Sequence, residues 1–142
     1  MNMANNSFSE FYAHISADGP PHCLEEHLQK VAVLAGEMAN SFQGQDWARL
    51  AGQWHDLGKY RKGFQRYIRQ TNGSEAHVEG KVAGREKTHS AAGALWAMHY
   101  FKEHHGPSGE LAARVFGYLI ASHHAGLYDR NGGLDARLAE ED

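Results

Sequence analysis

The sequence predicts an all-α protein arranged as a helical bundle, and three observations lead to this fold class. Apolar residues recur at intervals of three and four along most of the chain, which is the period of helices that bury one face. No run alternates apolar and polar residues between turn signals, so we expect no sheet. The length of 142 residues suits one core, and we therefore assign 1–142 to a single domain.

The first predicted helix follows Pro20-Pro21. Its apolar positions have helical spacing and are Leu24, Leu28, Val31, Ala35, Met38 and Phe42. His27 lies three residues after Leu24 and four before Val31, so it shares their face.

A turn over residues 43–46 precedes the second predicted helix, and Asp46 can cap that helix. The apolar stripe of the helix contains Trp47, Leu50, Ala51, Trp54 and Leu57. Gly58 suits the position just beyond a helix end, which would place His55 and Asp56 in the last turn. A side chain in the last turn can leave the core and face a cleft.

Further helices are predicted in the second half of the chain. Phe64, Tyr67 and Ile68 indicate a short helix, and the polar, Gly-rich residues 71–87 predict a long exposed loop. The next helix is capped by Thr88 or Ser90 and runs to about Phe101, with a face formed by His89, Ala92, Gly93, Trp96 and Tyr100. A later helix begins at Pro107-Ser108 and ends near His123 and His124, and Leu134 and Leu138 indicate the start of another.

Composition excludes several classes of protein. The formal net charge of -3 gives no global basic field, so any contact with nucleic acid would be local or supplied by a partner. The single cysteine, Cys23, cannot form an internal disulfide. Residues 1–10 lack the pattern of a signal peptide, and the longest apolar or small stretch, 91–98, is too short to span a bilayer. We therefore expect a cytoplasmic protein with no membrane partner.

Five histidines and one aspartate carry the strongest functional signal. They lie on, or at the end of, the apolar stripes of predicted helices and are His27, His55, Asp56, His89, His123 and His124. A histidine on a core-facing stripe is costly to bury unless something binds it. Five imidazoles and a carboxylate that converge from four helices would meet the needs of a two-metal hydrolytic site.

The donor types narrow the choice of metal and the role of Asp56. Imidazole nitrogen and carboxylate oxygen suit manganese, iron, nickel, cobalt or zinc better than calcium or magnesium. We therefore expect two divalent transition-metal ions. Adjacent helical residues differ by roughly 100° in direction, so His55 can address one metal while the two oxygens of Asp56 reach between both. Two such ions can clamp the attacking and leaving oxygens of a phosphoryl transfer.

Other residues have two possible interpretations. Lys59 lies one turn beyond the His-Asp pair, where it could stabilise a phosphate oxygen or protonate a leaving group as a catalytic residue beside Asp56, or be an ordinary solvated lysine. Trp47, Trp54 and Trp96 are interpreted as core residues. His14, His22 and His77 stand in polar or Pro-flanked segments and are interpreted as solvated.

These residues resemble the HD-domain phosphohydrolases, and within them the HD nuclease domain of the type I CRISPR effector helicase–nuclease. The stretches that carry the resemblance are Glu26-His27, Trp54-His55-Asp56-Leu57-Gly58-Lys59, Phe64-Gln65, Lys87-Thr88-His89-Ser90 and Ser122-His123-His124-Ala125-Gly126-Leu127. The doubled histidine followed by a small residue, Gly and Leu narrows the likeness to this branch. The resemblance covers residues from about Leu24 to Tyr128.

The resemblance implies an HD-domain-like helical bundle and a metal-dependent nuclease that cleaves single-stranded DNA in CRISPR antiviral defence. It implies that His27, His55 and Asp56 bind the first metal. It implies that Asp56, His89, His123 and His124 bind the second metal, with Asp56 shared. Lys59 matches the family lysine near the reacting phosphate. The implied partners are single-stranded DNA, a helicase domain in cis or in trans, and the CRISPR surveillance complex.

The chain departs from the family pattern at its C-terminal side. The family closes the first metal site with an aspartate on a later helix, whereas Asp129 and Asp135 come too early for this role. No helicase P-loop is present. We therefore expect that the chain is an N-terminal piece of a longer protein, or a truncated protein, and that it lacks C-terminal helices. Whether such a piece hydrolyses a substrate by itself is left open by the sequence.

Two other functions stay open from the sequence. The first is an HD phosphohydrolase that acts on nucleotides or cyclic dinucleotides, because its metal ligands would look the same. The second is a catalytically idle metal-binding module that recruits a helicase or the surveillance complex. Substrate size separates the first from a nuclease, and the absence of hydrolysis under every metal would favour the second.

Overall fold

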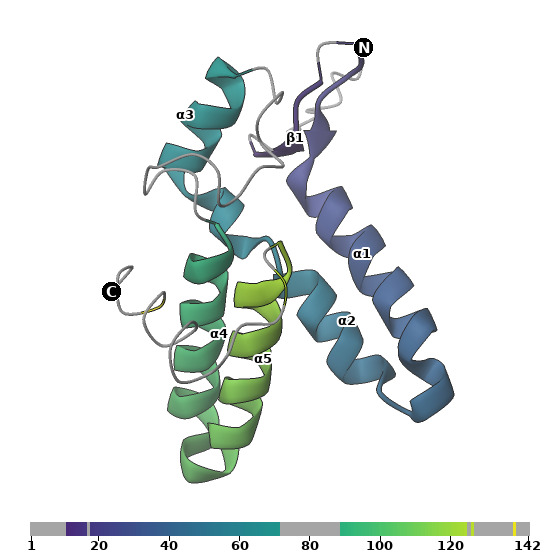
Figure 1. The fold of residues 1–142 in the computed structure, drawn as a ribbon, viewed down its shortest axis with the longest axis vertical. Coiled ribbons are helices and arrows are strands. Elements are labelled where there is room, and N and C mark those ends of the chain that lie inside the picture. The colour runs from purple at the N-terminus through teal and green to yellow at the C-terminus, as the bar shows by residue number, and fades with distance from the viewer. Residues whose placement is uncertain (1–10, 17, 72–88, 125, 127–137, 139–142) are drawn as a thin grey trace, which may run out of the picture.

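The computed structural model describes residues 11–16, 18–71, 89–124, 126 and 138. Within these residues the main elements are β1 (Tyr12–His14), β2 (His22–Cys23), α1 (Leu24–Ala39), α2 (Gln45–Trp54), α3 (Lys62–Gln70), α4 (Ser90–His105) and α5 (Glu110–Ser122). Short 3-10 turns cover Asn40–Phe42, Leu57–Tyr60 and Gly106–Gly109. The prediction of an all-α bundle is confirmed (Figure 1).

The helices form two antiparallel hairpins. Figure 1 shows α1 beside α2 and α4 beside α5, with α3 at the end of the bundle where α4 begins. The main core lies between α4 and α5, and its buried residues are Ala91, Ala94, Ala97, Phe116, Ile120, Ala121 and Leu138. Small side chains on α4 let α5 approach closely, and the larger side chains of α5 fill the space between the two helices.

The first hairpin is closed by a glycine. A Cβ atom on Gly52 of α2 would lie 2.9 Å from the Cα atom of Ala32 and 3.0 Å from the carbonyl oxygen of Val31. Only a residue without a side chain fits such an approach between two helix backbones. Gly52 thereby brings α1 and the end of α2 within reach of each other, which is where His27 and His55 stand.

The expectation that the chain contains no sheet is wrong in one place. β1 pairs with β2 in a two-stranded antiparallel sheet, with Tyr12 opposite Cys23 and His14 opposite His22. Strands of three and two residues are too short to show an alternating pattern in the sequence. The sheet holds the chain against the start of α1, because Ala13, Leu24 and Leu28 form a second small cluster of buried side chains.

The helix boundaries differ from the predicted ones at several points. α4 continues to His105 rather than ending near Phe101, and the second helix ends at Trp54, so that His55 and Asp56 follow it. Gly58 is not a helix-ending residue but part of the 3-10 turn Leu57–Tyr60. The short helix predicted around Phe64 is confirmed as α3. The loop predicted over 71–87 and the cap Thr88 lie almost wholly outside the described residues, as does Leu134.

Two of the three tryptophans are not core residues as predicted. Trp47 is 49% exposed and Trp96 is 45% exposed, whereas Trp54 is half-buried against the α4–α5 core. Trp47 stacks one ring face on Phe116, with 5.3 Å between ring centroids, and leaves much of its remaining surface to solvent. Large aromatic rings often cover the rim of a core in this way. In the part of the chain that the structure describes, no helix is both long and apolar enough to cross a membrane.

Candidate metal centre

The structure brings the six predicted side chains together in two groups. One group is His27, His55 and Asp56, and the other is Asp56, His89, His123 and His124. In each group the ligand atoms lie within 4.8 Å of one another. His27 comes from α1, His55 and Asp56 follow α2, His89 precedes α4, and His123 and His124 follow α5. Four segments that are distant in sequence thus meet at Asp56.

The two oxygens of Asp56 face different histidines. Oδ2 lies 3.1 Å from Nε2 of His27 and 3.1 Å from Nε2 of His55. Oδ1 lies 2.9 Å from Nε2 of His89 and 3.3 Å from Nε2 of His123. His124 joins the second group through its Nε2 atom, which lies 3.1 Å from Nε2 of His89. The carboxylate therefore stands between two sets of imidazoles and presents one oxygen to each.

Asp56 is buried, with 2% of its surface exposed. Burial by itself raises the pKa of a carboxyl group, but the four facing imidazoles outweigh it and hold the pKa of Asp56 far below its usual range. The aspartate is therefore a carboxylate at neutral pH, which is the form that binds a cation.

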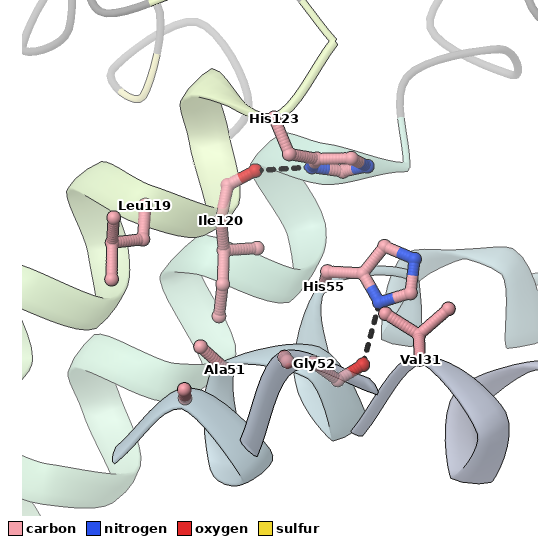
Figure 2. Close-up of a pocket in the computed structure, with 9 residues that line it drawn as sticks. Val31, Ala51, Gly52, His55, Leu119, Ile120 and His123 are labelled. Atoms are coloured by element: carbon pink, nitrogen blue, oxygen red, sulfur yellow. Dashed lines mark hydrogen bonds between the residues drawn. The ribbon is translucent and has the colours of Figure 1, made fainter. Parts of the chain in front are cut away.

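Two of the histidines are oriented by the backbone. Nδ1 of His55 donates a hydrogen bond to the carbonyl oxygen of Gly52 over 2.6 Å. Nδ1 of His123 donates to the carbonyl oxygen of Ile120 over 2.6 Å (Figure 2). Each bond requires a proton on Nδ1, so Nε2, the atom that faces Asp56, offers either a second proton to the carboxylate or a lone pair to a metal ion.

This donor set fits a positively charged occupant. Nε2 of His55 faces both an oxygen of Asp56 and Nε2 of His27, which is 3.2 Å away. Oδ1 of Asp56 and Nε2 of His123 are both buried, and among the described residues neither completes a hydrogen bond. Buried acceptors that face one another at this range repel unless a proton or a metal ion lies among them.

The spacing of the donors also agrees with metal coordination. Two ligand atoms that lie about 2.0–2.2 Å from the same ion are about 3 Å apart when they meet it at a right angle. The nitrogen–oxygen distances around Asp56 range from 2.9 to 3.3 Å. The residues present therefore fit two ions that share one carboxylate.

Lys59 lies inside the site rather than in solvent. Only 1% of its surface is exposed, so its interpretation as an ordinary solvated lysine is wrong. Its Nζ atom lies 2.9 Å from Oδ2 of Asp56 and donates a hydrogen bond of 3.3 Å to the carbonyl oxygen of Ala13. The ammonium group thus compensates the buried carboxylate and ties it to β1.

Gln65 is a structural residue of the site that the sequence analysis named only within the Phe64-Gln65 stretch of the resemblance and gave no role. Its Nε2 atom donates to the carbonyl oxygens of Tyr12, at 2.9 Å, and Lys59, at 2.8 Å. Its Oε1 atom accepts a hydrogen bond of 3.0 Å from the backbone N–H of Tyr12. The buried amide thereby joins β1, the turn that carries Lys59, and α3. A polar residue between the apolar Phe64 and Tyr67–Ile68 on a short helix was the available signal.

His89 is held by a close backbone contact and an aromatic ring. A Cβ atom on Gly58 would collide with the carbonyl group of His89, so only glycine allows this approach. The ring of Phe64 packs edge-on against His89, with 4.9 Å between centroids. The interpretation of His14 as a solvated residue is also wrong, because its ring lies 5.2 Å from that of His27 and is partly buried. His22 is exposed as predicted, and His77, Asp129 and Asp135 lie outside the described residues.

An apolar pocket of about 330 Å³ adjoins the site between α1, α2 and α5. His55 and His123 reach it, and its other lining residues are Val31, Ala35, Ala48, Ala51, Gly52, Leu119 and Ile120 (Figure 2). An apolar lining of this kind lowers the local dielectric constant beside His55 and His123, which strengthens their electrostatic interactions.

One comparison with known proteins identifies the family. The family described as Cas3, HD domain matches residues 13–141 of the chain. A comparison with curated proteins found no match. The matched range contains all six residues of the two metal-binding groups, together with Lys59 and Gln65. The chain therefore belongs to the Cas3 HD-domain family, which implies a metal-dependent nuclease of CRISPR defence.

Proposed function

We propose that this chain is a phosphodiesterase that cleaves single-stranded DNA with two metal ions, as part of CRISPR antiviral defence. The observation that carries the proposal is the position of Asp56, whose two oxygens face separate sets of histidines at 2.9–3.3 Å. A carboxylate so placed can bridge two cations. Pairs of metal ions that share ligands are typical of enzymes that hydrolyse phosphodiesters.

In this proposal His27, His55 and Asp56 hold one ion, and Asp56, His89, His123 and His124 hold the other. Manganese, iron, nickel, cobalt and zinc suit these nitrogen and oxygen donors. When bound, such ions polarise a phosphate oxygen and make water a stronger nucleophile near neutral pH. The group around His27 has three protein ligand atoms and the group around His89 has four, so we expect the first ion to bind more weakly.

The residues of the chain prepare the ligands for this task. The carbonyl groups of Gly52 and Ile120 fix the tautomers of His55 and His123, which keeps each Nε2 atom free to bind. The buried Lys59 donates to Asp56 and holds its carboxylate between the two groups. We propose that Lys59 positions Asp56 rather than contacting a phosphate, because its ammonium group is buried and already engaged.

The proposed partners follow from the family and from charge. A net charge of -3 means that the chain does not attract DNA as a whole, so a strand must bind at a local site or be delivered. A helicase domain, in cis or in trans, and the CRISPR surveillance complex are the proposed sources of the strand. The assignment of residues 1–142 to one domain, and of the protein to the cytoplasm, belongs to the same proposal.

The test is a cleavage assay on labelled single-stranded DNA with purified protein loaded with each metal in turn. We expect metal-dependent cleavage that a chelator abolishes and that His55→Ala and Asp56→Ala lose. His99→Ala is the matched control, because His99 is a histidine 74% exposed on α4 that pairs with Glu103. Cleavage that survives chelation or both site variants would refute the proposal. Turnover of free nucleotides without cleavage of DNA would instead favour a nucleotide phosphohydrolase, and metal binding without any hydrolysis would favour a recruitment module.

A further inference from the structure

A stack of aromatic rings lies along one exposed stripe of α4. Trp96, Tyr100 and His104 are spaced four residues apart and therefore stand one above another on the helix. The rings of Trp96 and Tyr100 have centroids 5.4 Å apart at an angle of 23°, and those of Tyr100 and His104 are 4.3 Å apart at 21°. Trp96 is 45% exposed and His104 is exposed, whereas Tyr100 between them is half-buried.

The stack stops at a small residue. One turn before Trp96 the same stripe carries Ala92, whose methyl group leaves the next ring position empty. A groove of about 430 Å³ opens at this point, and it is lined by Trp54, Leu57, Gly58, Arg61, Ala92 and Trp96. Trp54 meets Trp96 at 90° with 4.8 Å between centroids and forms one wall. The groove is thus shaped for a flat aromatic ring that continues the stack.

Positive charge borders the same groove. Arg61 lines it, and the exposed basic residues of the following helix α3 are Lys62, Arg66 and Arg69. Residues 57–70 contain no aspartate or glutamate, although the whole chain has more acidic than basic residues. A flat stacking surface beside cationic side chains matches the two needs of a single-stranded nucleic acid, which are stacking for its bases and compensation for its phosphates.

Part of the wall of the groove is formed by chain segments next to two residues of the metal-binding groups. Leu57 and Gly58 directly follow Asp56, and Ala92 is one turn beyond His89. Gly58 is packed against the carbonyl group of His89, so the wall of the groove consists of the backbone that carries two ligands. A strand held at Trp96 would therefore lie against the chain segments that carry Asp56 and His89.

We infer that this groove binds one base of a single DNA strand on Trp96, with the neighbouring phosphate on Arg61. The inference rests on the proposed function for the identity of the strand. It adds a binding site that uses none of the six metal ligands. The groove and the aromatic stripe together orient the strand along α4.

The inference is tested by the affinity for a fluorescent oligothymidylate, measured by anisotropy in the presence of chelator so that no cleavage occurs. We expect Trp96→Ala to weaken binding on the order of 10- to 100-fold, the usual effect of removing one stacking partner. Trp96→Tyr keeps an aromatic face and should restore most of the affinity. Ala92→Leu fills the empty ring position without removing an aromatic side chain and should weaken binding to a similar extent.

Two further variants separate stacking from charge and from general effects. Arg61→Gln should reduce the slope of log affinity against log salt by about 0.7, the contribution of one phosphate contact to a single strand. Phe42→Ala is the matched control, because Phe42 is an exposed aromatic residue on the 3-10 turn after α1, and it should bind as the wild type does. Circular dichroism of each variant checks that the fold is intact.

The outcomes distinguish this inference from the proposed function. Wild-type affinity in both Trp96→Ala and Ala92→Leu, or no binding by the wild type, would overturn the groove even if the metal-loaded protein cleaves DNA. Loss of binding in these folded variants would support the groove even if no metal yields cleavage.

Discussion

The two helical hairpins each supply ligands to the site, but they hold those ligands by different means. The α4–α5 hairpin encloses the main apolar core, so His89 and His123 stand at the end of a well-packed pair of helices. The α1–α2 hairpin leaves more large apolar side chains exposed, and these are Val33, Leu34, Met38, Phe42 and Trp47, against Trp96, Leu111 and Leu119 in the α4–α5 hairpin. Its buried apolar residues are concentrated in the first turns of α1, around His27.

The two hairpins therefore differ in the kind of contact that holds their ligands in place. In the α1–α2 hairpin the ligand-bearing end is held by β1, by the hydrogen bonds of Gln65 and by Lys59. The opposite end, where α1 turns into α2, leaves Met38 and Phe42 exposed. In the α4–α5 hairpin the packing extends along both helices. We therefore expect polar contacts to determine the first metal group, and apolar packing to determine the second.

The largest effect is expected from the residue that both hairpins share. Asp56→Ala should abolish the binding of both metals, because each group loses its carboxylate oxygen. It also leaves the buried Lys59 without its counter-charge, which costs about 3–5 kcal/mol of stability. Metal content and urea unfolding of the metal-free protein measure the two effects. The double variant Asp56→Ala with Lys59→Met is the control and should be more stable than the single one. A fully stable Asp56→Ala protein would contradict the proposed charge balance.

Removing one histidine from each group compares the hairpins directly. His89 is fully buried between Phe64 and Asp56, so His89→Ala should cost about 2–3 kcal/mol of unfolding free energy. His27 has 22% of its side chain exposed, and His27→Ala should cost less than about 1 kcal/mol. Each variant should bind one ion fewer than the wild type. Equal losses of stability in the two variants would show that the hairpins do not differ as described.

The contribution of the Gln65 hydrogen bonds to the first hairpin is tested by Gln65→Leu. This change leaves the N–H and carbonyl groups of Tyr12 and the carbonyl of Lys59 without their side-chain partner, which costs about 1–3 kcal/mol. Hydrogen exchange should accelerate at the amide of Tyr12, and the affinity for the first metal should fall more than that for the second. Gln70→Leu, at an exposed position of the same helix, should change neither property.

The smallest effect is expected at the far end of the first hairpin. Phe42 is 72% exposed, so Phe42→Ser should alter the free energy of unfolding by less than about 0.5 kcal/mol. Phe116→Ala removes a buried ring of the α4–α5 core and should cost about 3–5 kcal/mol. Thermal unfolding of both variants gives the comparison. A large loss in Phe42→Ser would mean that this end is covered in solution.

Much of the fold was predictable because the helices obey a simple period. The apolar spacing from Leu24 onward locates α1, and the same rule locates α3 and α5. The six predicted ligand positions also came from this period, since a histidine on an apolar stripe must point inward. Their role as metal ligands stays a prediction, and the structure adds the distances that support it.

The remaining features depend on contacts between segments that no local pattern shows. Lys59 follows a helix and looks solvated in sequence, but its burial depends on Ala13 and Asp56. Gly58 looks like a helix end, whereas it is needed because His89 approaches from a distant segment. The exposure of Trp96 was not predictable either, because it depends on what covers α4 and not on the spacing along it.

The position of the ligands along the chain has a consequence for how the protein is made. The first ligand is residue 27 and the last is residue 124, so the centre spans most of the polypeptide. Because a ribosome releases the N-terminal part first, a nascent chain that ends before α5 carries His27, His55, Asp56 and His89 but lacks His123 and His124. Such a chain can offer only part of the second group, and full metal occupancy therefore reports that translation has passed α5.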